Sequence, residues 1–429
     1  MPTWLDRDNG VRALLVVFAL SNFGYFLLDP LEPRFYPWLA LYSIQFLLLA
    51  GIVALRPSRL GEVIVAAVAS RIVLWFTAPV LEADFYRYLW DGHVWAHGIN
   101  PYLYPPEHAA LDDLETGYRF FITHSQFSTI YPPLAQVVFR VSHALAPDSL
   151  FGLKVLLTLF DLGTGLVLIK WLGERAQVLP GAALYLLNPL VLKEIANSAH
   201  VDAVAVFFAT ASLYAFCRSG PPRFASSIGW VLLSLSTASK LYASVYLPLL
   251  FRCDPKRWRH LAVAAVTLVL LYVPFLGAGS QLFSGTAAFG QFWIFNASLF
   301  RAVSWLSAFV APGNLLAPRV AVGLIFTAIV VDRARRTTVR SDVPHAALVV
   351  TGALLLLSPV VDAWYVLWIL PLAIVTRSAP WLAFTYLVAF SYAWFESPEL
   401  AGLFQIVEYV SLFTIMGLLW LPTTTKVKS

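Results

Sequence analysis

Apolar runs of about 15 to 20 residues recur along the chain and are separated by short polar or proline-containing joints. In helical form, a run of this length crosses the hydrocarbon core of a bilayer, which is about 30 Å thick. Only helices and closed barrels satisfy their own backbone hydrogen bonds in lipid, and runs this long are typical of helices. Because 59% of the residues are hydrophobic and 12% are charged, the chain cannot form an ordinary water-exposed surface. We therefore predict an all-α polytopic membrane protein.

We predict about 12 to 14 transmembrane helices within a single integral membrane domain that covers residues 1–429. A second apolar run follows the first so closely that the first is expected to be a retained span and not a cleaved signal peptide. The segments 241–251 and 320–331 are the shortest, and they are expected to be tilted, broken or extended by flanking residues. The predicted spans are residues 11–28, 38–55, 63–79, 155–171, 180–196, 203–217, 225–239, 241–251, 261–276, 320–331, 346–357, 364–376, 381–395 and 404–421.

Lysine and arginine are concentrated on alternate joints of the predicted bundle. Because basic residues are retained on the cytoplasmic side of a membrane, their positions predict its orientation. Both termini are then cytoplasmic and the long segment 80–150 is extracytoplasmic, so the net charge of +5 reflects topology and not nucleic-acid binding. Cys217 and Cys253 both lie at predicted cytoplasmic ends, where no disulfide is expected. The alternate joints hold 19 of the 29 basic residues: Arg7, Arg12, Arg56, Arg59, Lys170, Arg175, Arg218, Arg223, Arg252, Lys256, Arg257, Arg259, Arg333, Arg335, Arg336, Arg340, Arg377, Lys426 and Lys428.

The predicted extracytoplasmic loop differs in composition from the rest of the chain. It holds 13 aromatic rings, eight acidic residues and five of the eight histidines. Loops longer than about 15 residues are usually functional or contain elements of their own. Residues 84–97 are predicted to form an interfacial helix, because Asp84, Arg87 and Asp91 fall at i, i+3 and i+7 on one face. A second interfacial helix is predicted over residues 133–146, with proline in its first turn.

Two acidic residues, Glu82 and Asp84, stand where the third span ends. A carboxylate at this position can remove a proton from an acceptor hydroxyl while an apolar substrate tail stays in the bilayer. We interpret Asp84 as the candidate general base, with Glu82 and Asp91 as further catalytic candidates. The alternative is that Glu82 and Asp84 only end the span and contact solvent. The polar partners Arg87 and Asp91 on the same helix face favour the catalytic interpretation.

The order of these motifs resembles that of a known superfamily. Glu82-Ala83-Asp84, followed by Arg87-Tyr88 and Pro132-Pro133-Leu134, is similar to the GT-C superfamily of polyprenyl-phosphate-sugar-dependent glycosyltransferases. The resemblance covers nearly the whole chain and is strongest to the polyprenyl-phosphate-mannose-dependent mannosyltransferases. That similarity is carried by Asn188-Pro189, Lys193-Glu194, His200-Val201-Asp202, Ser239-Lys240, Ser358-Pro359, Asp362-Ala363-Trp364-Tyr365 and Leu370-Pro371.

Two features depart from the pattern of the superfamily. The acidic loop commonly follows the first span there, whereas here it follows the third, so residues 1–60 resemble an added amino-terminal hairpin of two spans. Because two spans are added, the catalytic loop, residues 80–150, stays on the same side of the membrane. Many relatives have His-Pro where this chain has Asp362-Ala363, so no catalytic role is transferred to that position.

The resemblance implies an inverting glycosyltransferase that moves a hexose, expected to be mannose, from a polyprenyl monophosphate donor to a hydroxyl of a lipid or glycan acceptor. Transfer is expected on the extracytoplasmic face of a bacterial cytoplasmic membrane, with membrane lipids as further partners and no nucleic acid. Lys240 is expected either to pair with an acid or to meet the donor phosphate, a role for which Arg140 also competes. The candidate substrate-binding and donor-phosphate-binding residues are Arg87, Arg119, Tyr131, Lys193, His200, Asp202, Lys240, Arg301, Trp364 and Tyr365.

No cofactor is expected. A monophosphate leaving group makes less demand for a divalent cation than a nucleotide diphosphate does, so a metal is compatible with the sequence but not implied by it. His93 and His97 have the i, i+4 spacing of metal ligands, but the pattern lacks a third ligand. Histidines hydrogen-bonded to the loop backbone are the alternative interpretation.

Two other functions fit a polytopic chain with buried charges: a transporter or flippase of lipid-linked sugars, and a structural assembly subunit. A transporter is expected to show paired spans broken by glycine or proline and acidic residues at the middle of the bilayer. Neither function calls for a long acidic outer loop, and this loop favours the enzyme.

Overall fold

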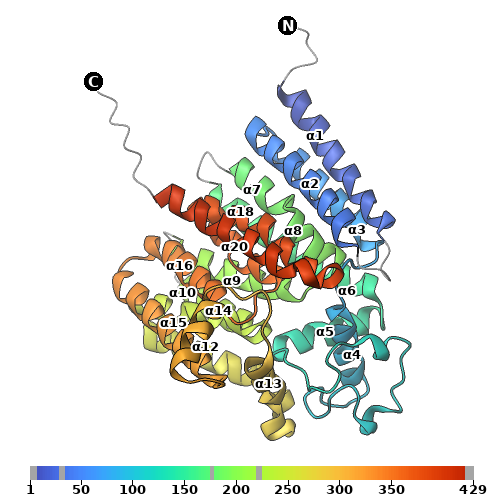
Figure 1. Ribbon diagram of the computed structural model, residues 1–429, viewed down its shortest axis with the longest axis vertical. Coiled ribbons are helices and arrows are strands. Elements are labelled where there is room, and N and C mark those ends of the chain that lie inside the picture. Colours follow the sequence, from blue (N-terminus) through green and yellow to red (C-terminus); the bar gives the residue numbers. More distant parts are fainter. Residues whose placement is uncertain (1–6, 29–33, 174–177, 219–224, 421–429) are drawn as a thin grey trace.

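The protein is described here by a computed structural model that covers residues 7–28, 34–173, 178–218 and 225–420 (Figure 1). The α-helices are α1 Arg7–Ser21, α2 Phe35–Leu55, α3 Leu60–Trp75, α4 Asp84–Ala96, α5 Pro133–Leu145, α6 Leu150–Leu172, α7 Val178–Leu186, α8 Pro189–Val191, α9 Asp202–Cys217, α10 Ala225–Ser239, α11 Leu247–Cys253, α12 Arg257–Tyr272, α13 Ser284–Phe292, α14 Leu299–Val310, α15 Leu316–Arg336, α16 Val343–Leu357, α17 Leu370–Thr376, α18 Ala379–Leu387, α19 Ala393–Glu396 and α20 Pro398–Trp420. The 3₁₀ segments are η2 Asn22–Leu27, η3 Ala109–Leu111, η4 Arg119–Phe121, η6 Leu241–Tyr246, η7 Val273–Phe283, η8 Arg340–Asp342, η9 Ala363–Trp368 and η10 Val388–Tyr392, and a π-helix, η5, covers Leu192–Asn197.

The predicted all-α class is confirmed, because the described residues contain helices and one isolated β-bridge but no named strand. Each of the fourteen predicted spans overlaps one or more helical segments of the described residues. How many of these helices cross the membrane stays a prediction. Among the described residues, seven segments are long and apolar enough to do so: Arg7–Leu27, Phe35–Leu55, Leu150–Leu172, Val178–Asn197, Arg257–Phe292, Arg340–Leu357 and Pro398–Leu419. Four shorter apolar helical segments are Asp202–Cys217, Leu241–Cys253, Leu299–Val310 and Ala363–Thr376.

The two helices predicted in the long loop are confirmed as α4 and α5, which pack on each other at one end of the molecule (Figure 1). Pro133 occupies the first turn of α5, where no helix hydrogen bond needs its missing N–H. The rings of Tyr88 and Phe139 stack across the helix pair with centroids 4.8 Å apart. Gly92 permits this approach, because a Cβ there would lie 2.5 Å from Phe139 O. This packing fixes α4, whose first residue is Asp84.

Polar side chains inside the bundle hold the segment that leads into the loop. Arg71 Nε lies 2.6 Å from Asp161 Oδ2, and both side chains are fully buried, so these two buried charges are paired with each other. Asn197 donates a hydrogen bond to Ala78 O over 2.7 Å and accepts one from Val80 N over 3.0 Å. These bonds connect the end of α3 to η5 and anchor the chain immediately before the acidic pair of the loop.

The amino-terminal helix α1 packs against both α2 and α3 (Figure 1). Arg12 Nε on α1 donates to Glu62 Oε1 on α3 over 3.0 Å. The start of α1 lies at the opposite end of the molecule from α4, α5 and α13. Of the basic residues used to predict the orientation, four lie outside the described residues: Arg175, Arg223, Lys426 and Lys428. The orientation, and the interpretation of residues 1–60 as an added hairpin, stay predictions.

Candidate active site

A cavity of about 820 Å³ opens at the end of the molecule that carries α4, α5 and α13. Every segment that lines it belongs to a joint, or to the adjoining end of a predicted span, that the positions of the basic residues put on the extracytoplasmic side. The predicted outer joints therefore converge on one site, although they are far apart in the sequence. The lining residues fall within segments 79–87, 123–131, 285–295, 362–365 and 394–395, together with Lys240.

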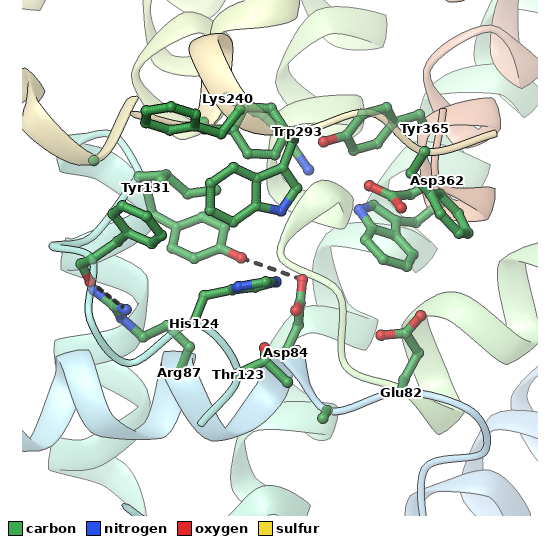
Figure 2. Close-up of a pocket in the computed structure, with 18 of the residues that line it drawn as sticks. Glu82, Asp84, Arg87, Thr123, His124, Tyr131, Lys240, Trp293, Asp362 and Tyr365 are labelled. Carbon is green, nitrogen blue, oxygen red and sulfur yellow. Dashed lines mark hydrogen bonds between the residues drawn. The ribbon is translucent and has the colours of Figure 1, made fainter. Parts of the chain in front are cut away.

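Asp84 reaches the cavity from the first turn of α4 (Figure 2). The amino-terminal end of a helix carries partial positive charge, which stabilises a carboxylate there. Tyr131 Oη donates to Asp84 Oδ2 over 3.4 Å, and this is the one side-chain hydrogen bond that the described residues give this carboxylate. Its other lone pairs can accept the proton of a bound hydroxyl.

Glu82 lies on the same wall but is held by a buried network. Its Oε1 accepts a hydrogen bond from Tyr392 Oη over 3.1 Å, and its Oε2 is 3.6 Å from His200 Nε2. Burial raises the pKa of the Glu82 carboxyl above its ordinary value, although the contact with His200 works in the opposite direction. Glu82 is thus engaged within the protein, whereas Asp84 is available to a substrate.

His200 is fully buried behind the cavity wall. Its Nδ1 lies 3.1 Å from Glu194 Oε2, and its ring stacks on Trp364 with centroids 4.0 Å apart. Burial alone would lower the pKa of the His200 imidazole, but the interactions with Glu194 and Glu82 outweigh burial and raise the pKa to about 10. A charged imidazolium between two carboxylates therefore supports Trp364, which lines the cavity.

Lys193 belongs to the same buried network. Its Nζ is 3.2 Å from Glu194 Oε2, and it lies over the ring of Tyr392 and contacts the hydroxyl of that residue. Neither Lys193 nor His200 lines the cavity. Both can act on a bound substrate only through the residues in front of them.

Lys240 reaches the cavity from the turn after α10 and is paired there with Asp202. Lys240 Nζ is 2.7 Å from Asp202 Oδ2, and Trp368 Nε1 donates to Asp202 Oδ1 over 2.6 Å. The Asp202 side chain is fully buried, whereas the Lys240 side chain is 16% exposed. Lys240 Nζ also lies 4.6 Å from the ring centroid of Tyr365. The two roles predicted for Lys240 are therefore compatible, because an acid-paired ammonium still faces the cavity.

Arg87 lines the cavity and holds Asp91 behind it. Arg87 Nε donates to Asp91 Oδ1 over 2.9 Å, and Nη1 donates to Phe127 O over 3.1 Å. Asp91 also accepts a hydrogen bond from Gln136 Nε2 over 2.9 Å, is 2% exposed and does not line the cavity. The Nη2 group of Arg87 is buried and has no hydrogen-bond partner among the described residues. The hydrogen-bonding capacity of this guanidinium is therefore not fully used within the protein.

Arg119 and Arg301, the other predicted phosphate-binding arginines, do not line the cavity. Arg119 donates to backbone carbonyls of the loop and to Asp112 Oδ1 over 3.1 Å. Arg301 is exposed on α14. Arg87 and Lys240 are the arginine and lysine side chains that line the cavity among the described residues.

Asp362, His124 and Trp293 line the cavity (Figure 2) but were not proposed as site residues from the sequence. Burial, together with the charges of Asp84 and Glu82, raises the pKa of the Asp362 carboxyl well above its ordinary value. The rings of His124 and Trp293 pack edge to face with centroids 4.6 Å apart. The one signal for Asp362 is its place two residues before the predicted aromatic pair. His124 and Trp293 have no local signal, because they meet only in the folded chain.

One wall of the cavity is apolar. It is made by α13 and the residues that follow it: Phe289, Phe292, Trp293, Ile294 and Phe295. Phe292 is 59% exposed and Ile294 is 48% exposed. A large exposed apolar surface of this kind is suited to bind an apolar ligand or the membrane, and here it adjoins the acidic residues of the cavity.

Ligand atoms gather closely enough to hold a metal ion in two groups of described side chains: Glu82, Glu194 and His200, and His93, His143 and Asp148. In the first group, the charge of His200 is balanced by both carboxylates, and no metal is needed to explain the arrangement. The second group lies outside the cavity. His97 belongs to neither group. Its Nδ1 contacts the backbone oxygen of His93 at 2.9 Å, in line with the alternative interpretation of the His93–His97 spacing.

The fold and the cavity define a polytopic all-α membrane protein with an acidic pocket at one end of the helical bundle. Comparison with protein families assigns it more closely. Residues 36–253 match the family described as Alpha-(1->6)-mannopyranosyltransferase, N-terminal domain. The chain belongs to this family, and the predicted resemblance to mannosyltransferases is confirmed.

Two curated proteins illustrate the relationship. The chain is 26% identical over 314 residues to Alpha-(1->6)-mannopyranosyltransferase A of Mycobacterium tuberculosis, a match that covers 66% of this chain and 58% of that protein. It is 24% identical over 341 residues to Alpha-(1->6)-mannopyranosyltransferase B of Corynebacterium glutamicum, covering 69% of this chain and 56% of that protein. The matches thus span a little over half the length of these relatives. No solved structure matches the chain.

Proposed function

We propose that the chain is an inverting mannosyltransferase that takes mannose from a polyprenyl monophosphate and adds it to a hydroxyl of a lipid or glycan acceptor on the extracytoplasmic face. The names of the relatives support the choice of mannose. The observation that carries the proposed chemistry is the position of Asp84, whose carboxylate reaches the cavity with one long hydrogen bond, from Tyr131.

Asp84 acts as the general base in this proposal. It accepts the proton of the acceptor hydroxyl while the hydroxyl oxygen forms a bond to the anomeric carbon of the donor. The bond between that carbon and the lipid phosphate breaks on the opposite face, and its electron pair leaves with the phosphate. A single displacement of this kind inverts the anomeric configuration.

Arg87 and Lys240 stabilise the negative charge that develops on the leaving phosphate. Both line the cavity, and Nη2 of Arg87 has no hydrogen-bond partner among the described residues. Lys240 is fixed in place by Asp202 at 2.7 Å before the donor binds. Cations that are already oriented lose little energy to reorganisation during the reaction, and this makes them effective in stabilising a transition state.

Asp362 serves as a hydrogen-bond donor to the sugar. Because burial and the neighbouring carboxylates raise its pKa, this carboxyl keeps its proton at pH values at which an ordinary aspartate is ionised. A neutral carboxyl beside Asp84 also avoids a second negative charge in the cavity. The proton stays on Asp362 throughout the transfer.

The apolar wall formed by α13 and residues 293–295 accommodates the first isoprene units of the donor. Each methylene buried from water contributes roughly 0.8 kcal/mol, so tail and phosphate bind as separate parts of one ligand. In the predicted orientation the cavity faces a compartment that lacks nucleotide sugars, and a lipid-linked donor is the form in which mannose reaches it. The same orientation leaves the acceptor free to approach from outside.

The proposal is tested with purified protein in liposomes that contain labelled polyprenyl-phosphate-mannose and a lipid-glycan extract as acceptor. We expect a product one hexose heavier than the acceptor, and no product when a water-soluble nucleotide-mannose replaces the lipid donor. Transfer from both donors at equal efficiency would contradict the lipid-linked donor. Movement of the donor between leaflets without any product would support the transporter alternative instead.

A further inference from the structure

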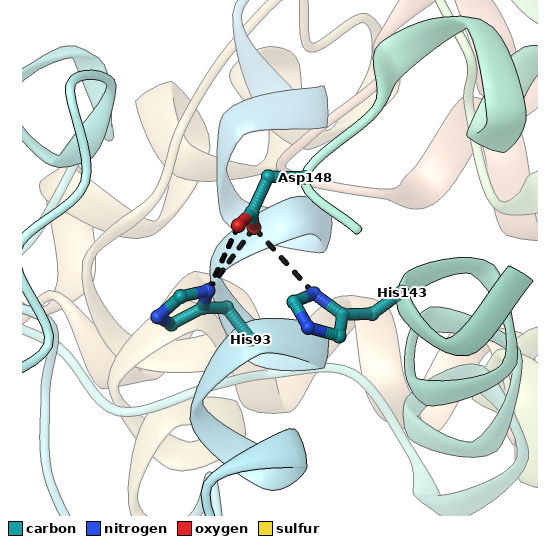
Figure 3. Close-up of side chains that lie close together, drawn as sticks. All are labelled: His93, His143 and Asp148. Atoms are coloured by element: carbon teal, nitrogen blue, oxygen red, sulfur yellow. Dashed lines mark hydrogen bonds and ion pairs between the residues drawn. The ribbon is translucent and has the colours of Figure 1, made fainter. Parts of the chain in front are cut away.

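A second cluster of ligand-type side chains lies in the extracytoplasmic loop, outside the cavity (Figure 3). His93 is near the carboxyl-terminal end of α4, His143 is near that of α5, and Asp148 lies in the turn before α6. Both imidazole rings point toward the Asp148 carboxylate. One ligand atom from each residue lies within 4.8 Å of the other two.

The separations within the cluster suit a tetrahedral metal site. His93 Nδ1 is 3.0 Å from Asp148 Oδ2, and His143 Nδ1 is 3.5 Å from Asp148 Oδ1. Ligand atoms that surround a tetrahedral Zn²⁺ at 2.0–2.1 Å are about 3.4 Å from one another. The planes of the two imidazoles are inclined at 84°, so the rings do not stack and both can be directed at one ion.

The contacts inside the cluster leave one buried ring nitrogen without a hydrogen bond. His143 Nδ1 is buried and has no hydrogen-bond partner among the described residues. The side chains of His93 and His143 are only 12% and 14% exposed. The Asp148 carboxylate lies 3.5 Å from this nitrogen, and a cation bound between the two would interact with both.

We propose that His93, His143 and Asp148 bind one Zn²⁺ ion. Two imidazoles and one carboxylate are a common zinc ligand set, and they leave the fourth tetrahedral position for a water molecule. The two nitrogen ligands disfavour Mg²⁺ and Ca²⁺, which prefer oxygen. Tyr118 Oη donates to Asp148 Oδ1 over 2.5 Å, so the carboxylate has the outer hydrogen bond that usually orients a metal ligand.

The ion would crosslink α4, α5 and the turn before α6. Of the two histidines noted in the sequence, His93 and His97, only His93 is a ligand, and His143 and Asp148 are the other two. Asp84 lies at the other end of α4 from His93. The bound ion therefore stabilises the helix that carries the proposed base, although its ligands do not line the cavity. Binding of the ion does not depend on the proposed sugar transfer.

The test uses the full chain, purified in detergent with an affinity tag that contains no histidine. The protein is incubated with Zn²⁺ alone and desalted, and its metal content is measured by mass spectrometry. A parallel sample with Co²⁺ reports a tetrahedral site through its visible absorption. The ligand variants are His93→Gln, His143→Gln and Asp148→Asn. His97→Gln is the matched control, because His97 is exposed and lies one helical turn from His93.

We expect one zinc per chain in the wild-type protein and in His97→Gln, and roughly a tenfold or larger loss of affinity in the three ligand variants. Zn²⁺ should raise the melting temperature of the wild-type protein and of His97→Gln, but not of the three ligand variants. Gel filtration identifies a variant that fails to fold. If the ligand variants do not fold, the Co²⁺ spectrum of the wild-type protein alone tests whether the tetrahedral site exists. The proposal is overturned if wild-type protein binds neither ion at micromolar concentration, or if folded His93→Gln and His143→Gln keep the wild-type zinc content.

Discussion

Lys240 Nζ lies 2.7 Å from Asp202 Oδ2, and this ion pair stands at the cavity wall beside the ring of Tyr365. The pair connects the start of α9 to the turn after α10, which are 38 residues apart. Because Asp202 is fully buried while Lys240 is partly exposed, the ammonium is held with one side toward the cavity. In the proposed reaction, this is where the leaving phosphate lies.

Lys240→Ala should therefore impair the use of the donor more than that of the acceptor. Loss of one charged hydrogen bond, worth about 1.5–3 kcal/mol, corresponds to a rise of roughly tenfold to a hundredfold in the KM for the donor. Lys240→Arg should restore part of the loss, since it restores the charge. Steady-state kinetics with each substrate varied in turn make the measurement.

The control for this substitution addresses folding. Lys240→Ala leaves Asp202 buried and unpaired, which is costly by itself. The double variant Lys240→Ala, Asp202→Asn removes that unpaired charge and should fold as well as the wild-type protein, but should still use the donor poorly. Unchanged donor kinetics in either folded variant would exclude Lys240 from phosphate binding.

Asp362→Asn should alter the dependence of the rate on pH. Because burial and nearby carboxylates raise the pKa of Asp362, the wild-type residue is neutral below that raised pKa and becomes a second anion beside Asp84 as the pH rises through it. The rate should fall on that alkaline side. Asparagine resembles the protonated carboxyl and cannot ionise, so the variant should stay active and lose the alkaline fall. A pH–rate profile of kcat/KM that is unchanged by the substitution would show that Asp362 does not titrate in the working range.

Much of the loop could be predicted from local patterns. The i, i+3, i+7 spacing that begins at Asp84 predicts α4, and the Pro132-Pro133 pair predicts the start of α5. Both features depend on neighbouring residues only. Glu82, Asp84 and Tyr131 were therefore proposed together as site residues, and all three line one cavity.

The partners of the charged residues could not be predicted, because they are set by contacts between distant parts of the chain. Lys193 was grouped with the site, but it pairs with Glu194 behind the wall. The helix α13 was also missed, since its sequence SGTAAFGQF interrupts the apolar run with small and polar residues. Trp293, which follows that helix, meets His124 only after folding.

Gly92→Ala should destabilise the loop. The new Cβ would lie 2.5 Å from Phe139 O, a backbone atom that cannot move without shifting α5. Such overpacking typically costs about 1–3 kcal/mol, and it would also displace α4 with Asp84. The melting temperature and the transfer rate should both fall. Gly117→Ala is the control, because nothing lies within 4 Å of a Cβ at that position; equal melting temperatures for the two variants would contradict the close packing of α4 on α5.

The predicted orientation can be tested with single cysteines in a chain that lacks Cys217 and Cys253. Gln126 lies in the loop beside the cavity and Thr338 lies between α15 and α16, and both are exposed. Gln126→Cys should react with a membrane-impermeant thiol reagent added to intact cells, and Thr338→Cys should react only after the cells are opened. The reverse result would place the cavity in the cytosol, where nucleotide sugars are available.

The central claim is that Asp84 is the general base, and the most direct measurement is the transfer rate of purified Asp84→Asn with saturating donor and acceptor. Loss of a general base typically reduces the rate by about 10²–10⁴-fold. We expect a loss in this range, with the affinity for the donor retained, while Glu82→Gln, whose wild-type side chain is bonded within the protein, loses less. A folded Asp84→Asn protein that keeps more than about a third of the wild-type rate would show a far smaller loss than that of a general base. This result would contradict the account and move the base to Glu82 or Asp91.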